Sequence, residues 1–408
     1  MTESAPSRVR LVATTREVDP IEDVLAHADP AHPLAWLRRG EGMIGFGAAA
    51  TISVGGHLAD PASVSHAGAL ADEWRAVVNA ASVTDEVGLP GTGLIAFGAL
   101  SFDPISSLPS TLVVPRFVFG RREGRSWITT VVSSDSDDSA TPEAPTPRPW
   151  GPAWSATVGP GALDAAGYQT AVQAALDAIS SGEVSKVVLA RDLVGSIPAG
   201  ADLRRLVRAL TTGYPDVWTY AVDGIIGASP ETLVTVSGGT ITARVLAGTA
   251  PRGADADADT QASVALFASG KDQDEHRFAV ESVLRTLRGH TSALTASEQP
   301  FALKLPNVWH LATDVEGVLR GGASALDLVG ALHPTAAVAG TPTAAALEVI
   351  RRIEPFDRGR YAGPVGWIDA AGDGEWAIAL RSAQFGEGGR ISAHAGAGIV
   401  PGSDPEAE

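Results

Sequence analysis

The sequence predicts an α+β fold in which mostly antiparallel sheets are covered by helices. Two hairpin patterns support this prediction, because apolar runs flank Asp223–Gly224 and Gly238–Gly239, dipeptides that suit tight turns between paired strands. Amphipathic helical patterns follow the hairpins, over 260–289 and 344–353. This order favours locally paired strands with helices packed outside them over a parallel sheet.

The other elements follow from the spacing of apolar residues. We expect further helices over 20–27, 64–80 and 164–181, and a break near Gly270 in the helix 260–289. We expect strands over 93–98, 125–132, 186–194, 218–222, 225–228, 233–236, 241–246, 376–385 and 390–394. Gly182 would end the helix 164–181, and Pro342 would begin the helix 344–353 near its first position.

Composition excludes several classes of protein. The chain has 408 residues, with 47 acidic and 30 basic side chains, and its net charge of −17 argues against nucleic-acid partners and anionic membranes. Hydrophobic residues make up 45% of the chain, enough for a sizeable core, and the absence of cysteine excludes disulfides and thiolate metal sites. No apolar run reaches the roughly 18 residues of a membrane-spanning helix. We therefore expect a cytoplasmic protein that is a monomer or a weak homo-oligomer.

We predict a single domain over 1–408 in three portions. Residues 1–132 would build sheet and core, and residues 155–408 would form the catalytic portion. Between them, 133–154 is rich in Pro, Asp and Ser and cannot bury much apolar surface, so we interpret it as an exposed loop. A boundary between two domains at this loop is the alternative.

Two residues are candidates for acid–base chemistry. Lys186 opens an otherwise apolar strand, so it lies either in solvent or in a cleft, where desolvation would favour the neutral form that acts as a base. Glu231 follows Pro230 directly after a strand, and the rigid backbone of proline would hold its carboxyl group in place. Glu231 is either a solvated turn residue or a general acid whose pKa is raised by burial.

Asp272 and Glu275 are candidates for a metal site. Their spacing of three residues places both carboxylates on one face of a helix, and oxygen ligands without cysteine suit Mg²⁺ rather than zinc. The alternative is an exposed first helical turn, where acidic residues are favoured by the helix dipole.

Several residues near the C-terminus could bind an anion. The glycines of Ala395–Gly398 follow a strand and would let backbone N–H groups approach a ligand closely. Arg381 lies in an apolar strand pattern, where a buried guanidinium needs a carboxylate partner, either within the protein or on a ligand. His310 stands in an apolar run and is either structural or a ligand contact. No P-loop, GxGxxG, HExxH or GxSxG motif is present.

The order of these motifs resembles that of the chorismate-utilising enzymes, most closely isochorismate synthases. The motifs are Lys-Val-Val-Leu-Ala-Arg (186–191), Gly-Ala-Ser-Pro-Glu (227–231), Leu-Ala-Gly-Thr-Ala-Pro-Arg (246–252), Lys-Asp-x-x-Glu-His (271–276), Trp-His-Leu (309–311), Leu-His-Pro-Thr-Ala-Ala-Val-Ala-Gly-Thr-Pro (332–342), Glu-Pro-Phe-Asp-Arg (354–358), Tyr-Ala-Gly-Pro-Val-Gly-Trp (361–367) and Ala-Gly-Ala-Gly-Ile-Val (395–400). The resemblance is strong over about 160–408 and loose before it.

The resemblance implies a fold, a substrate and a reaction. The fold would be a single large α+β domain of two packed, mainly antiparallel sheets surrounded by helices, as in anthranilate synthase component I. The substrate would be chorismate and the cofactor Mg²⁺. Lys186 would activate water for attack at C2 of the ring, and Glu231 would protonate the departing C4 hydroxyl, which is a poor leaving group without a proton donor.

The resemblance also assigns binding roles. The positions that match substrate-binding residues are Gly248, Thr249, His310, Tyr361, Arg381, Gly396 and Gly398. Glu275 matches a Mg²⁺ ligand, supported by Asp272, and Glu408 matches the first glutamate of a Glu-x-x-Glu helix that also carries a lysine in the family. The sequence ends at Glu408, so we expect it to omit a C-terminal tail that bears the second glutamate and the lysine.

Lys186 separates this chain from related subtypes. Anthranilate synthases carry glutamine at the matching position and use ammonia, and aminodeoxychorismate synthases carry a lysine in Pro-Ile-Lys-Ala-Gly, which Val245–Gly248 lacks. A salicylate synthase, which eliminates pyruvate in the same site, is the main alternative, although His333–Ala336 favours an isochorismate synthase. A non-catalytic chorismate-binding paralogue is the second alternative. The implied pathway is menaquinone or siderophore biosynthesis.

Overall fold

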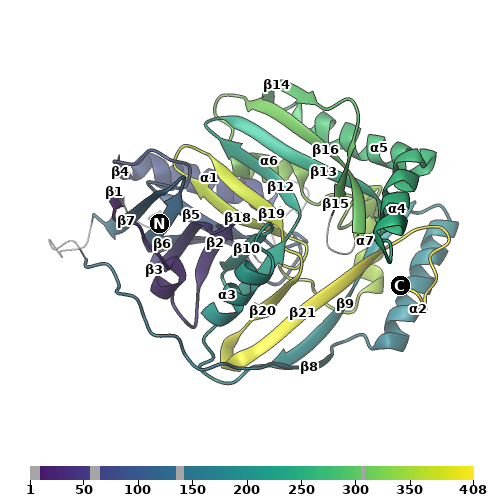
Figure 1. Cartoon of the computed structure of the whole chain (residues 1–408), viewed down its shortest axis with the longest axis horizontal. Helices are drawn as coiled ribbons and strands as arrows, with labels where there is room; N and C mark the ends of the chain where they lie inside the picture. Colours follow the sequence, from purple (N-terminus) through teal and green to yellow (C-terminus); the bar gives the residue numbers. More distant parts are fainter. Residues whose placement is uncertain (1–9, 56–64, 135–141, 305–307) are drawn as a thin grey trace, which may run out of the picture.

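The computed structural model describes residues 10–55, 65–134, 142–304 and 308–408, without the side chains of Lys271 and Glu275. Its strands form one continuous sheet, which has two arms that share strand β6 (Figure 1). Among the pairings of these residues, β1 pairs with β4 in parallel, and the other pairs are antiparallel. No helix in the described ranges is long and apolar enough to cross a membrane.

The first arm carries the strand that begins at Lys186. In spatial order its strands are β4 (Ser82–Asp85), β1 (Leu11–Val18), β7 (Arg125–Ser133), β6 (Ser110–Arg122), β3 (Glu41–Val54), β2 (Leu34–Arg38), β10 (Trp218–Val222), β11 (Ile225–Ser229), β20 (Ser382–Phe385), β21 (Arg390–Ile399) and β9 (Lys186–Ser196). The far edge of β9 is paired at its two ends, with β17 (Gly340–Thr341) and β8 (Thr157–Pro160).

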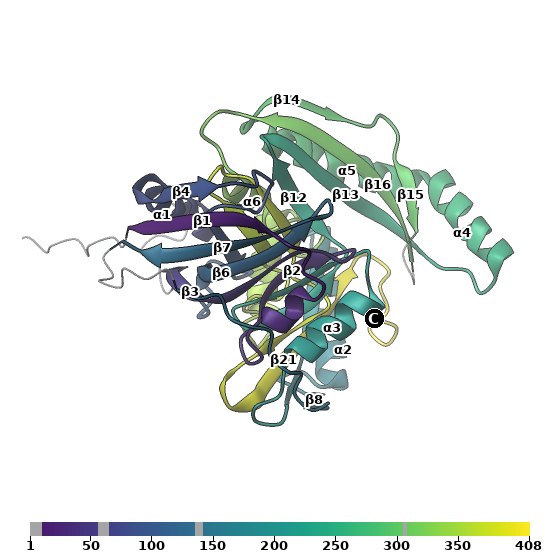
Figure 2. The same ribbon diagram turned by 60° about the vertical axis from the view of Figure 1, so that its left-hand side comes forward.

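The second arm runs from β6 to a pair of long strands that are distant in the sequence. Its strands are β5 (Ile95–Ala99), β18 (Pro364–Asp369), β19 (Gly374–Ile378), β12 (Thr232–Ser237), β13 (Thr240–Pro251) and β16 (Val308–Leu319), with β14 (Thr291–Ala296) and β15 (Phe301–Lys304) on the far edge of β16. Figure 2 shows that the β13–β16 end, with the helices behind it, stands away from the rest of the molecule.

Buried aromatic side chains fill the space between the two arms. Trp36 and Tyr220 come from the first arm and pack in one cluster with Phe97 and Trp367 from the second. Each is fully buried, and burial of one large apolar side chain contributes roughly 1.5–3 kcal/mol. The predicted fold of two packed, mainly antiparallel sheets is therefore confirmed, with the addition that the two sheets are continuous through β6.

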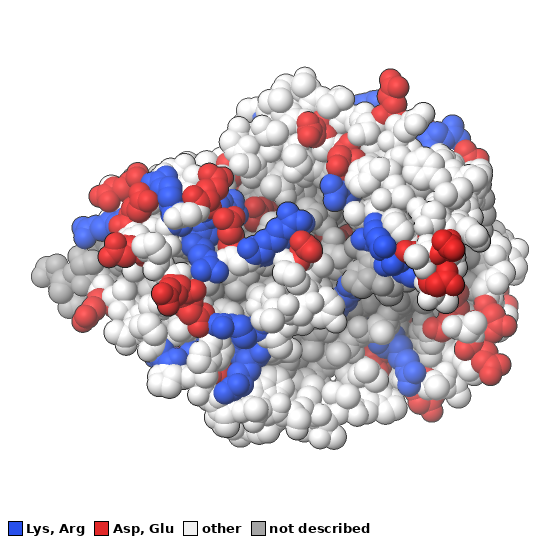
Figure 3. All heavy atoms as spheres, in the orientation of Figure 1, with Lys and Arg blue, Asp and Glu red and all other residues white. Residues whose placement is uncertain are grey.

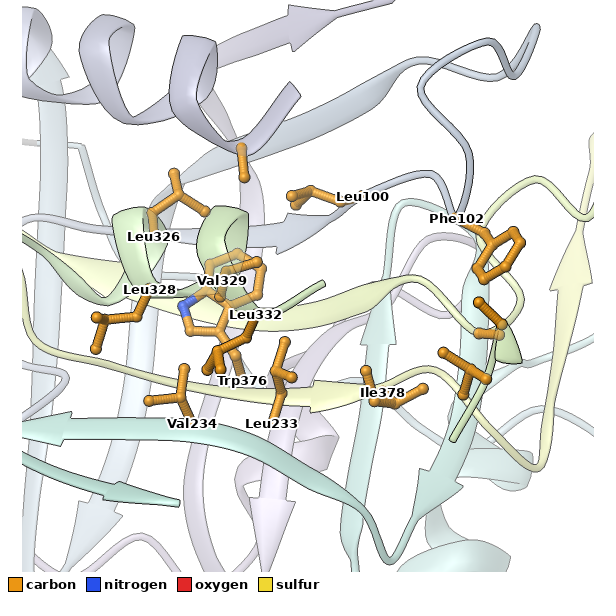
Figure 4. Packing of buried hydrophobic residues seen from close by; sticks show 14 of the residues in the cluster. Leu100, Phe102, Leu233, Val234, Leu326, Leu328, Val329, Leu332, Trp376 and Ile378 are labelled. Carbon is orange, nitrogen blue, oxygen red and sulfur yellow. The ribbon is translucent and has the colours of Figure 1, made fainter. Parts of the chain in front are cut away.

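Helices cover the outer faces of both arms. They are α1 (His66–Ala80), α2 (Ala165–Ser180), α3 (Arg204–Gly213), α4 (Ala256–Ala268), α5 (Gly270–Leu287), α6 (Ala325–Leu332) and α7 (Thr343–Ile353), with short 3-10 turns η1 (Val24–His27) and η2 (Glu387–Gly389). Ser324 caps α6 in a capping box with Asp327. Figure 4 shows Leu326, Val329 and Leu332 of α6 beside Trp376 of β19, in the apolar cluster that also includes residues of α1, α2 and α7.

Most predicted elements are present, and three expectations are corrected. Residues 20–27 form only the short turn η1 rather than a longer helix. The predicted strand 376–385 is two strands, because β19 pairs with β12 in the second arm whereas β20 pairs with β11 in the first. Ala395–Gly398 do not follow a strand but lie inside β21, since β21 pairs with β9 as far as Ile399.

Strands from both sides of the predicted loop 133–154 are paired with each other. β5 pairs with β18, and β2 pairs with β10. Residues 142–154 contain no helix or strand, and Trp150 and Trp154 pack partly against the cluster beneath α3. Residues 135–141 of the predicted loop lie outside the described ranges, and the division into portions stays a prediction.

Candidate active site

The paired strands β9 and β21 form one wall of the candidate site. Lys186 is half-buried at the start of β9, and a Cβ placed on Gly398 of β21 would lie 3.2 Å from the Lys186 Cε. A side chain at position 398 would therefore crowd the lysine stem. Glycine at this position leaves the space over β21 to Lys186.

Gly396 and Gly398 direct their backbone N–H groups away from β9. In the β9–β21 pairing, Gly396 lies opposite Ala190 and Gly398 lies opposite Val188. The N–H groups of Ala190 and Val188 point away from β21, and they donate to the Glu354 carboxylate and to the Ala339 carbonyl. In an antiparallel pair, residues opposite each other in this way both turn their polar groups outward. On that outer edge, β20 pairs only with Ile391–Ala393 of the described β21, so both glycines can offer N–H donors to a ligand.

Glu231 lies in the short link between β11 and β12. Its backbone is fixed by a bond from the Ile378 N–H to the Glu231 carbonyl at 3.0 Å and from the Glu231 N–H to the Ser229 hydroxyl at 3.2 Å. Burial raises the pKa of Glu231 to about 7, and the nearby positive charge of Lys186 opposes this rise. The structure thus brings the predicted base and acid together and gives the acid a pKa near neutrality.

Tyr361 closes the site beneath the glycines. Its hydroxyl oxygen lies 3.1 Å from the position of a Cβ built on Gly396, and its ring stacks on His394 with centroids 5.0 Å apart. Burial raises the pKa of Tyr361, and the charge of Glu231 adds to the rise. The phenol therefore stays protonated near neutral pH and can donate a hydrogen bond to an anionic ligand.

The paired strands β13 and β16 supply the opposite wall. Gly248 has φ +75° at an irregularity in the pairing, and next to it Thr249 Oγ1 lies 2.9 Å from His310 Nδ1 on β16. Burial, with a smaller effect of the Arg381 charge, lowers the pKa of His310, so its ring is neutral at pH 7. Thr249, His310 and Arg381, predicted separately, are therefore neighbours.

Arg381 differs from its prediction. It is exposed, has φ +50° and stands in the crossing between β19 and β20 rather than inside a buried strand. Its carbonyl accepts a hydrogen bond of 3.3 Å from the Ala228 N–H, which places it beside the strand that leads to Glu231. An exposed guanidinium needs no internal carboxylate, so it is available to an anionic ligand.

The structure places the side chains of two of the three predicted metal ligands, Asp272 and Glu408. Asp272 is half-buried in the first turn of α5, where Ser269 caps the helix, and its Cβ lies 3.2 Å from a Cβ built on Gly248. Glu408 is exposed, and its charge adds to the burial that raises the pKa of Tyr168 to about 12. The side chain of Glu275 lies outside the description.

A divalent cation that favours oxygen fits this donor set only in part. Within the described side chains, no group of three or more His, Asp or Glu is placed to hold a metal ion. Mg²⁺, however, commonly binds through one or two carboxylates together with water and the oxygens of an anionic substrate. Asp272 beside the Gly248 wall suits that kind of site.

Sequence reasoning missed two histidines and one ion pair around the site. His276 of α5 contacts the Ala247 carbonyl at 3.2 Å and the Thr313 hydroxyl at 2.7 Å, and so connects α5 to both of the paired strands β13 and β16. His394 stands at the end of a predicted strand, and the structure shows that it stacks on Tyr361. Glu354 and Arg358 stand in the motif 354–358, where an acid and a base four residues apart were the available signal.

The family model described as "Chorismate binding enzyme" matches residues 2–408. The chain belongs to the chorismate binding enzymes. Isochorismate synthase EntC of Escherichia coli is 34% identical over 325 residues, covering 77% of each chain. Isochorismate synthase DhbC of Bacillus subtilis is 39% identical over 253 residues, covering 59% of this chain and 63% of the relative.

A solved structure supports the same family and fold. MenF, the menaquinone-specific isochorismate synthase of E. coli, superimposes on this chorismate binding enzyme with a TM-score of 0.78 at 26% sequence identity. The match covers 100% of this chain and 93% of the MenF chain.

Proposed function

We propose that the chain is an isochorismate synthase, an isomerase that converts chorismate to isochorismate by adding water at C2 and losing the C4 hydroxyl. The observation that carries the proposal is the pairing of Lys186 with a half-buried Glu231 whose pKa lies near 7. An acid in this range is partly protonated at neutral pH and can still release its proton, as general acid catalysis requires. The relatives named isochorismate synthase support the same reaction.

The chemistry divides between the two residues. Lys186 Nζ takes a proton from a water molecule as the water oxygen forms a bond to C2 and the ring double bonds shift. Glu231 gives its proton to the C4 oxygen as the C4–O bond breaks, so that a second water molecule leaves. The reaction ends with a Glu231 carboxylate and a Lys186 ammonium, which exchange protons with solvent before the next turnover.

The other residues hold an anionic substrate. The N–H groups of Gly396 and Gly398, the Tyr361 hydroxyl and the Arg381 guanidinium would bind the substrate carboxylates. His310 would lie near the ring carboxylate, and Gly248 and Thr249 near the leaving hydroxyl. The chain carries −17 overall, and acidic and basic side chains are interspersed on the face in Figure 3, so local donors rather than a global field must attract the substrate.

We propose Mg²⁺ as the cofactor, held by Asp272, Glu275 and Glu408 together with oxygens of the substrate. When bound, Mg²⁺ neutralises a substrate carboxylate and fixes its orientation. We place the reaction in the cytoplasm, in menaquinone or siderophore biosynthesis.

Product analysis tests the proposal. The protein is mixed with chorismate and Mg²⁺, and isochorismate, salicylate and pyruvate are quantified by chromatography. We expect isochorismate without pyruvate, and loss of product in Lys186→Ala. Salicylate with stoichiometric pyruvate would instead identify a salicylate synthase. Binding of chorismate without any product by the folded protein would identify a non-catalytic paralogue.

A further inference from the structure

The strand that carries Lys186 has a gap on one edge. β21 pairs with β9 from Val187 to Ser196 on one side. On the other side, β17 pairs with Lys186 and Val187, and β8 pairs only from Leu193 onward. Among the described strands, none covers the stretch between them. Exposed backbone polar groups in such a buried stretch need partners from elsewhere.

Two buried side chains fill this gap. The Ala190 N–H donates to Glu354 Oε1 at 2.7 Å, and an Arg358 Nη donates to the Val188 carbonyl at 2.6 Å. The two side chains are joined to each other, from Arg358 Nε to Glu354 Oε2 at 2.8 Å. Carboxylate and guanidinium together therefore present one acceptor and one donor to β9, as a neighbouring strand would.

The ion pair also connects β9 to the loop that precedes α7, and it lies near Tyr361. A second Arg358 Nη donates to the Val338 carbonyl at 3.0 Å, and the guanidinium carbon lies 4.4 Å from the centre of the Phe102 ring. Both side chains are close enough to Tyr361 for their charges to act on its phenol. The pair therefore lies near Tyr361, one of the residues proposed to bind substrate.

The geometry points to Glu354 and Arg358 as positioning residues that hold β9 in place, and with it Lys186 against Glu231. This inference rests on the proposed function. Val188 stands two residues after Lys186 on the same face of β9, so displacement of the strand at Val188 moves the lysine. A buried ion pair is a weak source of net stability, which leaves the fixing of geometry as its main contribution.

Three variants test this role. Glu354→Ala removes the acceptor for the Ala190 N–H. Arg358→Lys keeps the positive charge but removes the planar guanidinium that donates to the Val188 carbonyl. Glu354→Gln keeps a side-chain oxygen that can accept from the Ala190 N–H. We expect kcat to fall about 30-fold in Glu354→Ala and about tenfold in Arg358→Lys, with KM changed less than about threefold, and Glu354→Gln to recover most of kcat.

A second readout separates positioning from stability. The Lys186 charge opposes the rise in the pKa of Glu231, so withdrawal of the lysine raises that pKa further. We therefore expect the midpoint of a ¹³C NMR titration of Glu231, measured without ligand, to shift to higher pH in Glu354→Ala and in Arg358→Lys. The matched control is Asp202→Ala, which breaks the buried Asp202–Arg204 pair on another part of the fold and leaves kcat and this pKa unchanged.

Folded variants with wild-type kcat and an unshifted Glu231 pKa would overturn the positioning role. If Glu354→Ala does not fold, Arg358→Lys decides between the same two results. The titration needs no turnover, so it still tests the placement of Lys186 if the wild-type protein makes no isochorismate, which would refute the proposed function separately.

Discussion

The two walls of the site differ in what surrounds them. The wall of β9 and β21 rests on buried apolar side chains, including Val187, Leu189 and Ile399, and its lysine faces a half-buried acid. The wall of β13 and β16 stands away from the body of the molecule (Figure 2), and α4 and α5 beside it leave Val264 and Phe278 62% exposed.

This difference places the acid–base residues and the proposed cation site in different surroundings. In the protein without ligand, burial and the charge of Lys186 already determine the pKa of Glu231. The opposite wall offers the neutral polar side chains of His310 and Thr249 and the carboxylate of Asp272, whose charge a bound cation would balance. We therefore expect changes at Lys186 and Glu231 to affect kcat, and changes at Asp272 in the second wall to affect metal dependence.

The largest effect should come from the acid–base pair. Lys186→Ala and Glu231→Gln each remove one proton transfer and should lower kcat about 10³-fold, within the usual range for general acid–base groups. KM should change little. Arg39→Ala, which removes an exposed cation of the first arm, is the control. Steady-state kinetics with near-normal kcat in either variant would contradict the proposed roles.

Removal of the cation should have the next largest effect and act on the second wall. EDTA should lower the rate at least about 100-fold, and Asp272→Asn should raise the Mg²⁺ concentration for half-maximal rate about tenfold. Asp274→Asn, an exposed neighbour paired with Arg277, should change it little. Full activity after chelation would show that the second wall works without a cation.

Smaller effects should follow from methyl groups added to β21. In Gly396→Ala the new Cβ meets the Leu189 carbonyl oxygen at 2.8 Å and the Tyr361 hydroxyl at 3.1 Å, and we expect KM to rise about tenfold. In Gly398→Ala it meets only the flexible end of Lys186, and we expect kcat to fall about threefold. Gly213→Ala, with open space around it, is the control. Equal effects of the two variants on KM would contradict this division.

The smallest effect should be on stability. Glu231 has a pKa of about 7 in the folded protein and about 4.5 when unfolded, so its contribution to stability is present below pH 4.5 and is lost as the pH rises through 7. Glu231→Gln cannot ionise and should be about 1–2 kcal/mol more stable than wild type at pH 8. Urea unfolding at pH 5 and pH 8 measures this, with exposed Glu298→Gln as the control. An equal effect at both pH values would contradict the raised pKa.

Sequence reasoning could single out Lys186 and Glu231 as candidates because both residues stand in short motifs next to strong element signals. Lys186 opens a clear strand, and Glu231 follows Pro230. It misplaced Arg381, because the spacing of apolar residues does not reveal that the chain crosses from one arm to the other between β19 and β20. It also missed the contact of Glu354 with Ala190, since these residues are 164 positions apart and meet only in the fold.

The central claim is that the fold alone sets the environment of the acid. Its most direct test is the pKa of Glu231 in the protein without Mg²⁺ or chorismate. The ¹³C carboxyl resonance of labelled glutamate is followed with pH, and Glu231→Gln assigns the signal. A midpoint of about 7 is expected, because burial sets this value before any ligand binds. A midpoint near the ordinary 4.5 would show that the fold alone does not prepare the acid.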